Sequence, residues 1–471
     1  MISIPRRGRT HDDILQEMAA FKQKDADYLG GRTWSLVYHH SDAHDQFLKK
    51  AHNLFFCENA LNPMAFRSLK RFEHEVIQMA ARLLNGDDRV TGTLTSGGTE
   101  SCLLPVLACR ERAAAKKRWT RFTPEMIAPE SIHVAWDKAA RYFNVKMVKI
   151  PLTRDLTMDL GCLQKKINRN TIMIVASAPS YPHGVIDPVA DIGRLAAQKK
   201  IPFHVDACLG GFFLPFMEAA GHPVPRFDFR CPGVTSMSAD VHKYGFGAKG
   251  ASVVLYKDIS YLKHQFFIHT DWPGGVFASP ALLGTRPGGP IAAAWAAVNA
   301  MGMEGYKTMA AGVMQTTRQI MSGIRSVKGL KILGKPQMSV FAYTAADKNI
   351  NIFAVADLME EKGWHIDRLQ KPRGLHAMVT PAHEQVAGQY LEDLNESVAA
   401  ARANPDLAAK GNAAMYGMMA TVPFRGMIRK EVMKMMENMY GPACTMPLDS
   451  PETVPWTVRL GSRILKWLKI N

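Results

Sequence analysis

Short apolar runs alternate with segments of helical periodicity through the middle of the chain. The runs that predict strands lie at residues 132–135, 145–150, 172–176, 202–205, 234–238 and 251–256. Segments that predict helices separate several of them, at residues 138–143, 160–167 and 189–199. This alternation is typical of an α/β fold, with a parallel or mixed sheet covered on both faces. Polar residues at the carboxyl ends of such strands are candidates for a binding site.

The flanking segments predict an arm before this sheet and a smaller domain after it. Apolar side chains recur at helical spacing over residues 63–84 and the pattern ends at Asn85-Gly86, which indicates a core helix. A helix over residues 306–327 precedes four more expected strands, at residues 330–333, 339–343, 364–369 and 376–380. We therefore expect an N-terminal arm over residues 1–61, a large domain over 62–310 and a smaller C-terminal α/β domain over 311–471.

Composition narrows the class of protein without indicating a site. Of 471 residues, 47% are hydrophobic and 21% are charged, which is typical of soluble globular proteins with a large core. The seven cysteines are scattered and form no CxxC pair, which favours a reducing compartment over disulfides or a structural zinc site. No secretory signal or bilayer-spanning stretch is evident. We expect a soluble cytoplasmic protein without a metal or a transmembrane segment.

The formal net charge of +16 favours anionic partners. Basic residues gather only mildly, at residues 6–9, 110–121 and 165–169, and aromatic residues do not alternate with them. A solvated basic surface is therefore a better interpretation than a nucleic-acid interface. A phosphorylated substrate, or peripheral contact with an anionic membrane, would suit the same charge.

The most informative stretch is residues 238–250, Ser-Ala-Asp-Val-His-Lys-Tyr-Gly-Phe-Gly-Ala-Lys-Gly. It lies between two expected strands and places Lys243 just after the first of them. Burial disfavours the charged form of a lysine, and a neutral amine can attack an aldehyde. Our hypothesis is that Lys243 holds pyridoxal phosphate as a Schiff base. A lysine in a glycine-rich turn is more often an ordinary surface residue, so the rest of the chain must support this hypothesis.

A second stretch offers a binding site for phosphate. Residues 95–101, Thr-Ser-Gly-Gly-Thr-Glu-Ser, precede an apolar helix over residues 102–115. Free backbone N–H groups, hydroxyl groups and the positive end of the helix dipole would converge on an anion here. The stretch matches neither the dinucleotide nor the nucleoside-triphosphate loop. An ordinary helix N-cap with a tight turn is the alternative.

Two further residues lie at or near the expected strands. Asp206 closes a buried run, and a buried carboxylate must be paired or become protonated. An ionised Asp206 facing a pyridine nitrogen would keep that nitrogen protonated, as the chemistry of pyridoxal phosphate requires. A helix N-cap is the alternative. His133, expected inside the strand at 132–135, could stack on the cofactor ring or occupy a core position.

Together these stretches resemble the group II pyridoxal-phosphate decarboxylases and, more narrowly, the sphingosine-1-phosphate lyase family. The resemblance spans most of the chain and is carried by residues 95–101, 137–143, 181–188, 204–212, 238–250 and 284–288. The Tyr-Pro-His-Gly stretch at 181–184 and the Asp-Ala-Cys-Leu-Gly-Gly stretch at 206–211 favour the lyases over the amino-acid decarboxylases. The resemblance implies a fold-type-I, transferase-like homodimer with active sites shared between the subunits.

The resemblance also implies a role for each candidate residue around the cofactor. Lys243 would bind pyridoxal phosphate covalently, Asp206 would bind its pyridine nitrogen and His133 would stack on its ring. The residues that would hold the cofactor phosphate are Gly98, Thr99, His242 and, reaching in from the partner chain, Thr285.

On the substrate side, Tyr38 and Lys249 match family positions that would bind the substrate phosphate and assist proton transfer. The family usually has Asn-Pro-Leu-His-Pro or a close variant before its first long helix, whereas this chain has Asn-Ala-Leu-Asn-Pro at 59–63. Asn62 therefore stands where a histidine is expected, and an amide cannot carry charge near neutral pH. This departure concerns substrate recognition more than cofactor binding. The membrane anchor of eukaryotic members is not seen, so the chain resembles a soluble prokaryotic form.

The resemblance implies a carbon–carbon lyase that cleaves a phosphorylated long-chain base to a fatty aldehyde and ethanolamine phosphate. An amino-acid decarboxylase on the same scaffold is one alternative, and its site would have to hold an α-carboxylate instead of a second phosphate and an alkyl chain. A non-catalytic basic binding protein is the other, and it predicts salt-dependent affinity for nucleic acid. The general base and the preferred chain length stay open.

Overall fold

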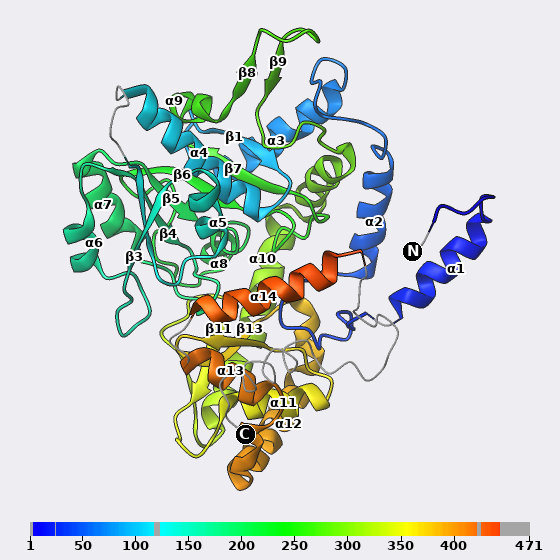
Figure 1. The fold of residues 1–471 in the computed structure, drawn as a ribbon, viewed down its shortest axis with the longest axis vertical. Helices are drawn as coiled ribbons and strands as arrows, with labels where there is room; N and C mark the ends of the chain where they lie inside the picture. Colours follow the sequence, from blue (N-terminus) through cyan, green and yellow to red (C-terminus); the bar gives the residue numbers. More distant parts are fainter. Residues whose placement is uncertain (1–2, 24, 117–122, 422–424, 443–471) are drawn as a thin grey trace.

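The computed structural model describes residues 3–23, 25–116, 123–421 and 425–442 (Figure 1). A seven-stranded sheet with the order β1-β7-β6-β5-β4-β2-β3 forms the large domain. Its strands are β1 (Thr91–Thr95), β2 (Glu125–Pro129), β3 (Lys146–Ile150), β4 (Thr171–Ser177), β5 (Phe203–Asp206), β6 (Val234–Ala239) and β7 (Ser252–Tyr256). Only β7 runs antiparallel to its neighbours β1 and β6. The carboxyl ends of the other six strands therefore lie at one edge.

Helices cover both faces of this sheet (Figure 1). Successive residues of β2 and β4 point into two different apolar clusters, as strand geometry requires. One cluster contains side chains of α4 (Gly98–Lys116) and α5 (Ala135–Tyr142). The other contains side chains of α3 (Arg67–Leu83), α7 (Val189–Lys199), α8 (Leu214–Ala219) and α10 (Gly288–Ser326). Because both faces of the sheet are buried, the central strands have continuous apolar sequences, which is why the sequence predicts them.

A second sheet follows α10, with four antiparallel strands in the order β10-β11-β13-β12. Its strands are β10 (Leu330–Ile332), β11 (Val340–Ala345), β12 (Asp367–Gln370) and β13 (Arg373–Met378), and its helices are α11 (Ile352–Glu361), α12 (Ala387–Ala403), α13 (Gly411–Thr421) and α14 (Arg425–Tyr440). The predicted boundary at residue 310 falls inside α10, whose kink lies at Gly302, so the division stays a prediction. Residues 443–471 of the predicted small domain lie outside the described residues.

The N-terminal arm carries α1 (His11–Lys22) and α2 (Asp42–Asn53). No residue of α1 is buried, and the helix stands apart from the rest of the chain (Figure 1). A hairpin of β8 (Phe267–His269) and β9 (Phe277–Ser279) projects at the top of Figure 1 and follows α9 (Ile259–Leu262) in the chain. The helix α6 (Leu160–Lys166) lies between β3 and β4 in the sequence. No helix within the described ranges combines the length and the apolarity that crossing a bilayer demands.

Two local predictions differ from the structure. The expected strand at 132–135 is wrong: the strand is β2, residues 132–134 form the turn that follows it, and Ala135 begins α5. A short apolar run cannot by itself distinguish a strand from the buried start of a helix. The strand β1 and the hairpin of β8 and β9 were not predicted. The sequence of β1 is rich in glycine and threonine, and β8 and β9 are only three residues long each.

Candidate active site

A cavity of about 240 Å³ lies at the edge where the strand ends meet. Five strands deliver residues to it, because the segments after β1, β2, β4, β5 and β6 all line it. The predicted residues that it brings together are Gly98, Thr99, His133, Asp206, His242 and Lys243. Residues in its wall that we did not predict include Cys102, Ser177, Tyr181, Cys208 and Asp240.

Lys243 forms an ion pair with Asp240 in this cavity. The distance between Lys243 Nζ and Asp240 Oδ2 is 2.9 Å, and the carboxylate is fully buried. Burial lowers the pKa of Lys243, but the charge of Asp240, its hydrogen bond to the amine and the neighbouring Tyr38 and Cys208 together raise the pKa well above its usual value. The expectation that burial alone makes this amine neutral is therefore wrong. The missed signal is the Asp-x-x-Lys spacing, which places the two side chains within one turn.

Asp206 is oriented from two sides at the end of β5. Its Oδ2 accepts a hydrogen bond of 2.8 Å from Trp136 Nε1, and its Oδ1 accepts one of 3.1 Å from the backbone N–H of Cys208. The side chain is buried, and its two donors hold the carboxylate at one position in the cavity wall. Trp136 belongs to α5, so a contact between distant segments creates this arrangement.

His133 lies in the turn between β2 and α5, and not in a strand as we had expected. Its Nδ1 accepts a hydrogen bond of 3.2 Å from the backbone N–H of Ala135. The ring is exposed on one side and lines the cavity on the other, edge-on to Tyr181 at 6.1 Å between centroids. An imidazole in this place can lie against the face of a flat ligand and keep water from it.

The segment before α4 has the features of a phosphate site. The helix begins at Gly98, and the first N–H groups of a helix have no partner within it. Gly97 has a φ of +148°, and a Cβ at Gly98 would lie 2.5 Å from Asp240 Oδ2, so glycine is required there. His242 Nδ1 is buried without a hydrogen-bond partner in the described part of the chain. An anion at this end of the cavity would satisfy both groups.

Tyr38 and Lys249 lie beside Lys243 but do not line this cavity. The ring of Tyr38 packs edge-on against Tyr244 at 5.1 Å, and Lys249 Nζ lies 5.0 Å from the centre of the Tyr38 ring. Lys249 Nζ also donates a 2.9 Å hydrogen bond to the carbonyl of Leu36. Surrounding protein, and then the charge of Lys243, lower the pKa of Lys249 to about 8.

Two predicted positions lie away from the cavity in the same chain. Thr285 is exposed, and its Oγ1 accepts a 3.3 Å hydrogen bond from Asn59 Nδ2. Its predicted reach into a partner subunit stays a prediction. Asn62 is exposed as well, and its Oδ1 accepts hydrogen bonds from the backbone N–H groups of Met64 at 3.0 Å and Ala65 at 3.2 Å. Its carbonyl oxygen therefore serves the local turn.

Two thiols lie beside Asp206. The ligand atoms of Cys102, Asp206 and Cys208 lie within 4.8 Å of one another. Burial raises the pKa of Cys102 to about 11, and the contact with Cys102 together with burial raises that of Cys208. Both cysteines are therefore neutral thiols at physiological pH. Metals bind thiolates, so these side chains are better suited to packing beside Asp206.

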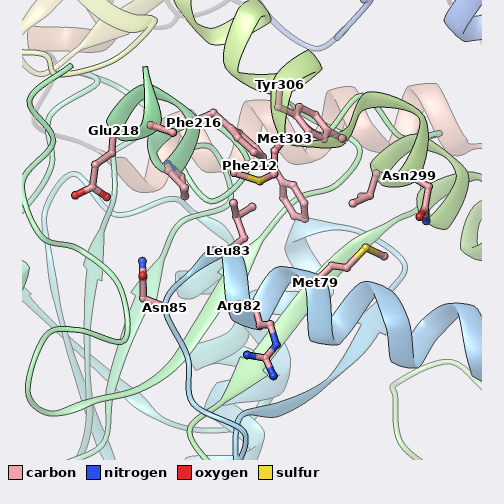
Figure 2. A pocket seen from close by; sticks show the side chains of 14 residues that line it. Met79, Arg82, Leu83, Asn85, Phe212, Phe216, Glu218, Asn299, Met303 and Tyr306 are labelled. Atoms are coloured by element: carbon pink, nitrogen blue, oxygen red, sulfur yellow. The ribbon is translucent and has the colours of Figure 1, made fainter. Parts of the chain in front are cut away.

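A larger cavity of about 690 Å³ lies between α3, α8 and α10 (Figure 2). Its wall includes Phe216 and Tyr306, whose rings stack at 4.6 Å between centroids. The hydroxyl of Tyr306 donates a 2.7 Å hydrogen bond to the carbonyl of Gly245. This cavity therefore lies behind the turn that carries Lys243, and its wall supports that turn.

The residues around the smaller cavity fit pyridoxal phosphate. A lysine amine, an oriented carboxylate, an imidazole at the mouth and an unsatisfied anion site are the groups that this cofactor requires. A family model described as the pyridoxal-dependent decarboxylase conserved domain matches residues 61–345. The fold and the site thus define a pyridoxal-phosphate-dependent enzyme, which confirms the predicted fold class and cofactor.

Known proteins identify the family more narrowly. A sphingosine-1-phosphate lyase of Oryza sativa is 41% identical over 433 residues, covering 90% of this chain and 80% of the relative. A sphingosine-1-phosphate lyase of Rattus norvegicus is 41% identical over 441 residues, covering 93% of this chain and 77% of the relative. A solved structure of a Burkholderia pseudomallei sphingosine-1-phosphate lyase is 39% identical to this chain and superposes on it with a TM-score of 0.82. The match covers 87% of this chain and 95% of that structure. This chain belongs to the sphingosine-1-phosphate lyase family, as its sequence stretches predicted.

Proposed function

We propose that this enzyme cleaves a phosphorylated long-chain base of the sphingosine 1-phosphate type to a fatty aldehyde and ethanolamine phosphate. The observation that carries the proposal is the convergence of Lys243, Asp206 and the anion site on one cavity. The relatives support it as well, because those named above are lyases of this phosphorylated base.

Bound pyridoxal phosphate would supply a ring that takes up the electron pair left when a carbon–carbon bond breaks. Lys243 would attach the cofactor, and Asp206 would hold a proton at the pyridine nitrogen. Asp240 would place the Lys243 amine, since the two groups are 2.9 Å apart. His133 would cover the ring and exclude water. Gly98, Thr99 and His242 would bind the cofactor phosphate through N–H groups.

The phosphate of the substrate requires a second cationic site. Lys249 and Tyr38 are our candidates, because they lie together beside Lys243 and one of them carries charge near neutral pH. Asn62 contributes no charge there. Peripheral contact with a membrane that carries the amphiphilic substrate stays a prediction from the net charge of +16, as does a cytoplasmic location.

A product assay on the purified enzyme tests this function. The enzyme loaded with pyridoxal phosphate is incubated with a phosphorylated sphingoid base and, separately, with glutamate and with aromatic amino acids. We expect a fatty aldehyde and ethanolamine phosphate from the first and no carbon dioxide from the others. Carbon dioxide without aldehyde would support the amino-acid decarboxylase. Tight, salt-dependent binding of nucleic acid without any turnover would support a basic binding protein.

We also propose a homodimer with shared active sites. Two observations support it: Thr285 is exposed away from the cavity of its own chain, and α1 presents exposed apolar side chains. The large apolar residues of α1 are Ile14, Leu15, Met18 and Phe21, which helical spacing places on one face. A second copy of the chain would cover this face.

A further inference from the structure

Tyr181 connects the cavity to the C-terminal sheet. It follows β4, and its side chain lines the same cavity as Lys243 and His133. The hydroxyl of Tyr181 donates a 2.8 Å hydrogen bond to Oδ2 of Asp367. Asp367 is the first residue of β12, in register with His376 of β13. A strand of the C-terminal sheet thus contacts a wall of the active site directly.

The surroundings of Tyr181 fix both its ring and its protonation. The ring stacks on His376 at 4.4 Å between centroids and an interplanar angle of 30°. Burial, and then the carboxylate of Asp367, raise the pKa of Tyr181 far above its usual value. Burial lowers the pKa of His376 to about 4, so this imidazole is neutral. Tyr181 is therefore a neutral phenol that holds one proton and directs it at Asp367.

The loop that carries Tyr181 is held against β11. Gly184 has a φ of +67°, and a Cβ there would lie 1.7 Å from the carbonyl oxygen of Val340. The carbonyl of Gly184 accepts a hydrogen bond from the backbone N–H of Gln337, and the side chain of Gln337 accepts one from the N–H of Ile186. These contacts fix the backbone of the loop that carries Tyr181 relative to β11.

This geometry determines what Tyr181 offers to a substrate. A phenol has one hydrogen to donate and lone pairs to accept with, and here Asp367 takes the hydrogen. The Tyr181 oxygen can then only accept a hydrogen bond from a ligand in the cavity, through its lone pairs. A substrate hydroxyl can donate to it, whereas an α-carboxylate, which is an acceptor with a negative charge, is repelled by the oxygen and by Asp367.

We propose that Asp367 is a positioning residue that determines specificity, because its hold on the Tyr181 hydroxyl makes the site select a hydroxyl group beside the reacting amine. This role rests on the proposed function, in which the carbinol carbon of the base carries that hydroxyl. The same arrangement disfavours amino acids, and it separates a lyase from a decarboxylase on this scaffold. Tyr181 is also placed to accept the hydroxyl proton, with its own proton moving to Asp367.

The test compares three ligands that lack the amine and therefore undergo no reaction. They are 3-hydroxydecyl phosphate, 3-oxodecyl phosphate and decyl phosphate, and calorimetry on the loaded enzyme measures their dissociation constants. We expect the wild type to bind the hydroxy ligand about tenfold more tightly than the oxo ligand, the value of one good hydrogen bond. In Asp367→Asn the amide can donate to Tyr181, so the hydroxyl proton is free to turn to the cavity. The ratio of the dissociation constant of the oxo ligand to that of the hydroxy ligand should then fall from about ten to about one. The same fall is expected in Tyr181→Phe.

Tyr343→Phe is the matched control, because it removes a buried hydroxyl of the same sheet that contacts Tyr390. It should leave the ratio at the wild-type value. An unchanged ratio in Asp367→Asn would overturn the proposal, and so would an equal loss of affinity for all three ligands. The proposed function fails separately, if the wild type releases no aldehyde from a phosphorylated base, whatever the ratio is.

Discussion

At the scale of single residues, the charges in and beside the cavity determine which groups can hold a proton. Asp240 keeps Lys243 in its ammonium form before the cofactor arrives, so the amine must lose a proton to react. Lys249 differs, because its pKa of about 8 makes it the cation most sensitive to pH among our candidate residues. These two lysines, six positions apart, therefore have opposite shifts for the same physical reason, the balance between burial and a neighbouring charge.

The titration of Lys249 predicts a pH dependence of substrate binding. The ammonium is present below about pH 8 and is lost as the pH rises through that value. If Lys249 binds the substrate phosphate, KM should rise about tenfold for each pH unit above its pKa, because the charged fraction falls by that factor. Steady-state kinetics between about pH 7 and about pH 9 measure it. Lys249→Arg stays charged over this range and should show a flat KM. The same rise in that variant would exclude Lys249 as its cause.

At the scale of elements, a buried ion pair joins the loop before α10 to α3. Arg286 contacts Glu73 through two hydrogen bonds of 2.7 and 3.1 Å, and the Glu73 carboxylate also accepts the N–H of Leu94 in β1. Arg286 counteracts the effect of burial and lowers the pKa of Glu73. The pair therefore fixes β1, whose end leads to the phosphate site, relative to the loop that contains Thr285.

Removing one member of this pair should destabilise the fold. Arg286→Ala leaves the Glu73 carboxylate buried without its partner, which costs about 3–5 kcal/mol. The apparent free energy of unfolding in urea is the measurement. Arg89→Ala is the control, because it removes an exposed arginine that pairs with Asp87 at the surface. That change should cost less than about 1 kcal/mol. Equal effects of the two substitutions would contradict the role given to the buried pair.

Some of the residues around the cavity were predictable from the sequence and others were not. Residues such as Asp206 and Lys243 were predictable because they follow apolar strands, and parallel strands bring such ends together. Trp136, Tyr181 and Asp367 were not, because their roles come from contacts between segments far apart in the chain. Asp367 in particular belongs to the four-stranded C-terminal sheet. The spacing of apolar residues along the chain predicts single strands and helices, but it does not predict how two sheets pack against each other. The strand expected around His133 failed because four apolar or aromatic residues suit either element.

At the scale of the whole molecule, the apolar face of α1 predicts the oligomeric state. Leu15 and Met18 are about 60% exposed in the single chain, so charged substitutions there should hardly affect its own stability. In a dimer they would place charge against the partner. We expect Leu15→Glu combined with Met18→Glu to shift the sedimentation coefficient from dimer to monomer, whereas Gln16→Glu leaves it unchanged. A wild type that sediments as a monomer would contradict the proposed dimer.

Every role proposed for the site depends on Lys243 as the residue that holds the cofactor. Reduction of the loaded enzyme with borohydride fixes the cofactor to its lysine, and peptide mass spectrometry locates it. We expect the added mass on Lys243 in the wild type and in Lys249→Ala, and no added mass in Lys243→Ala. Finding the cofactor on Lys249 or on any other lysine would contradict the central claim.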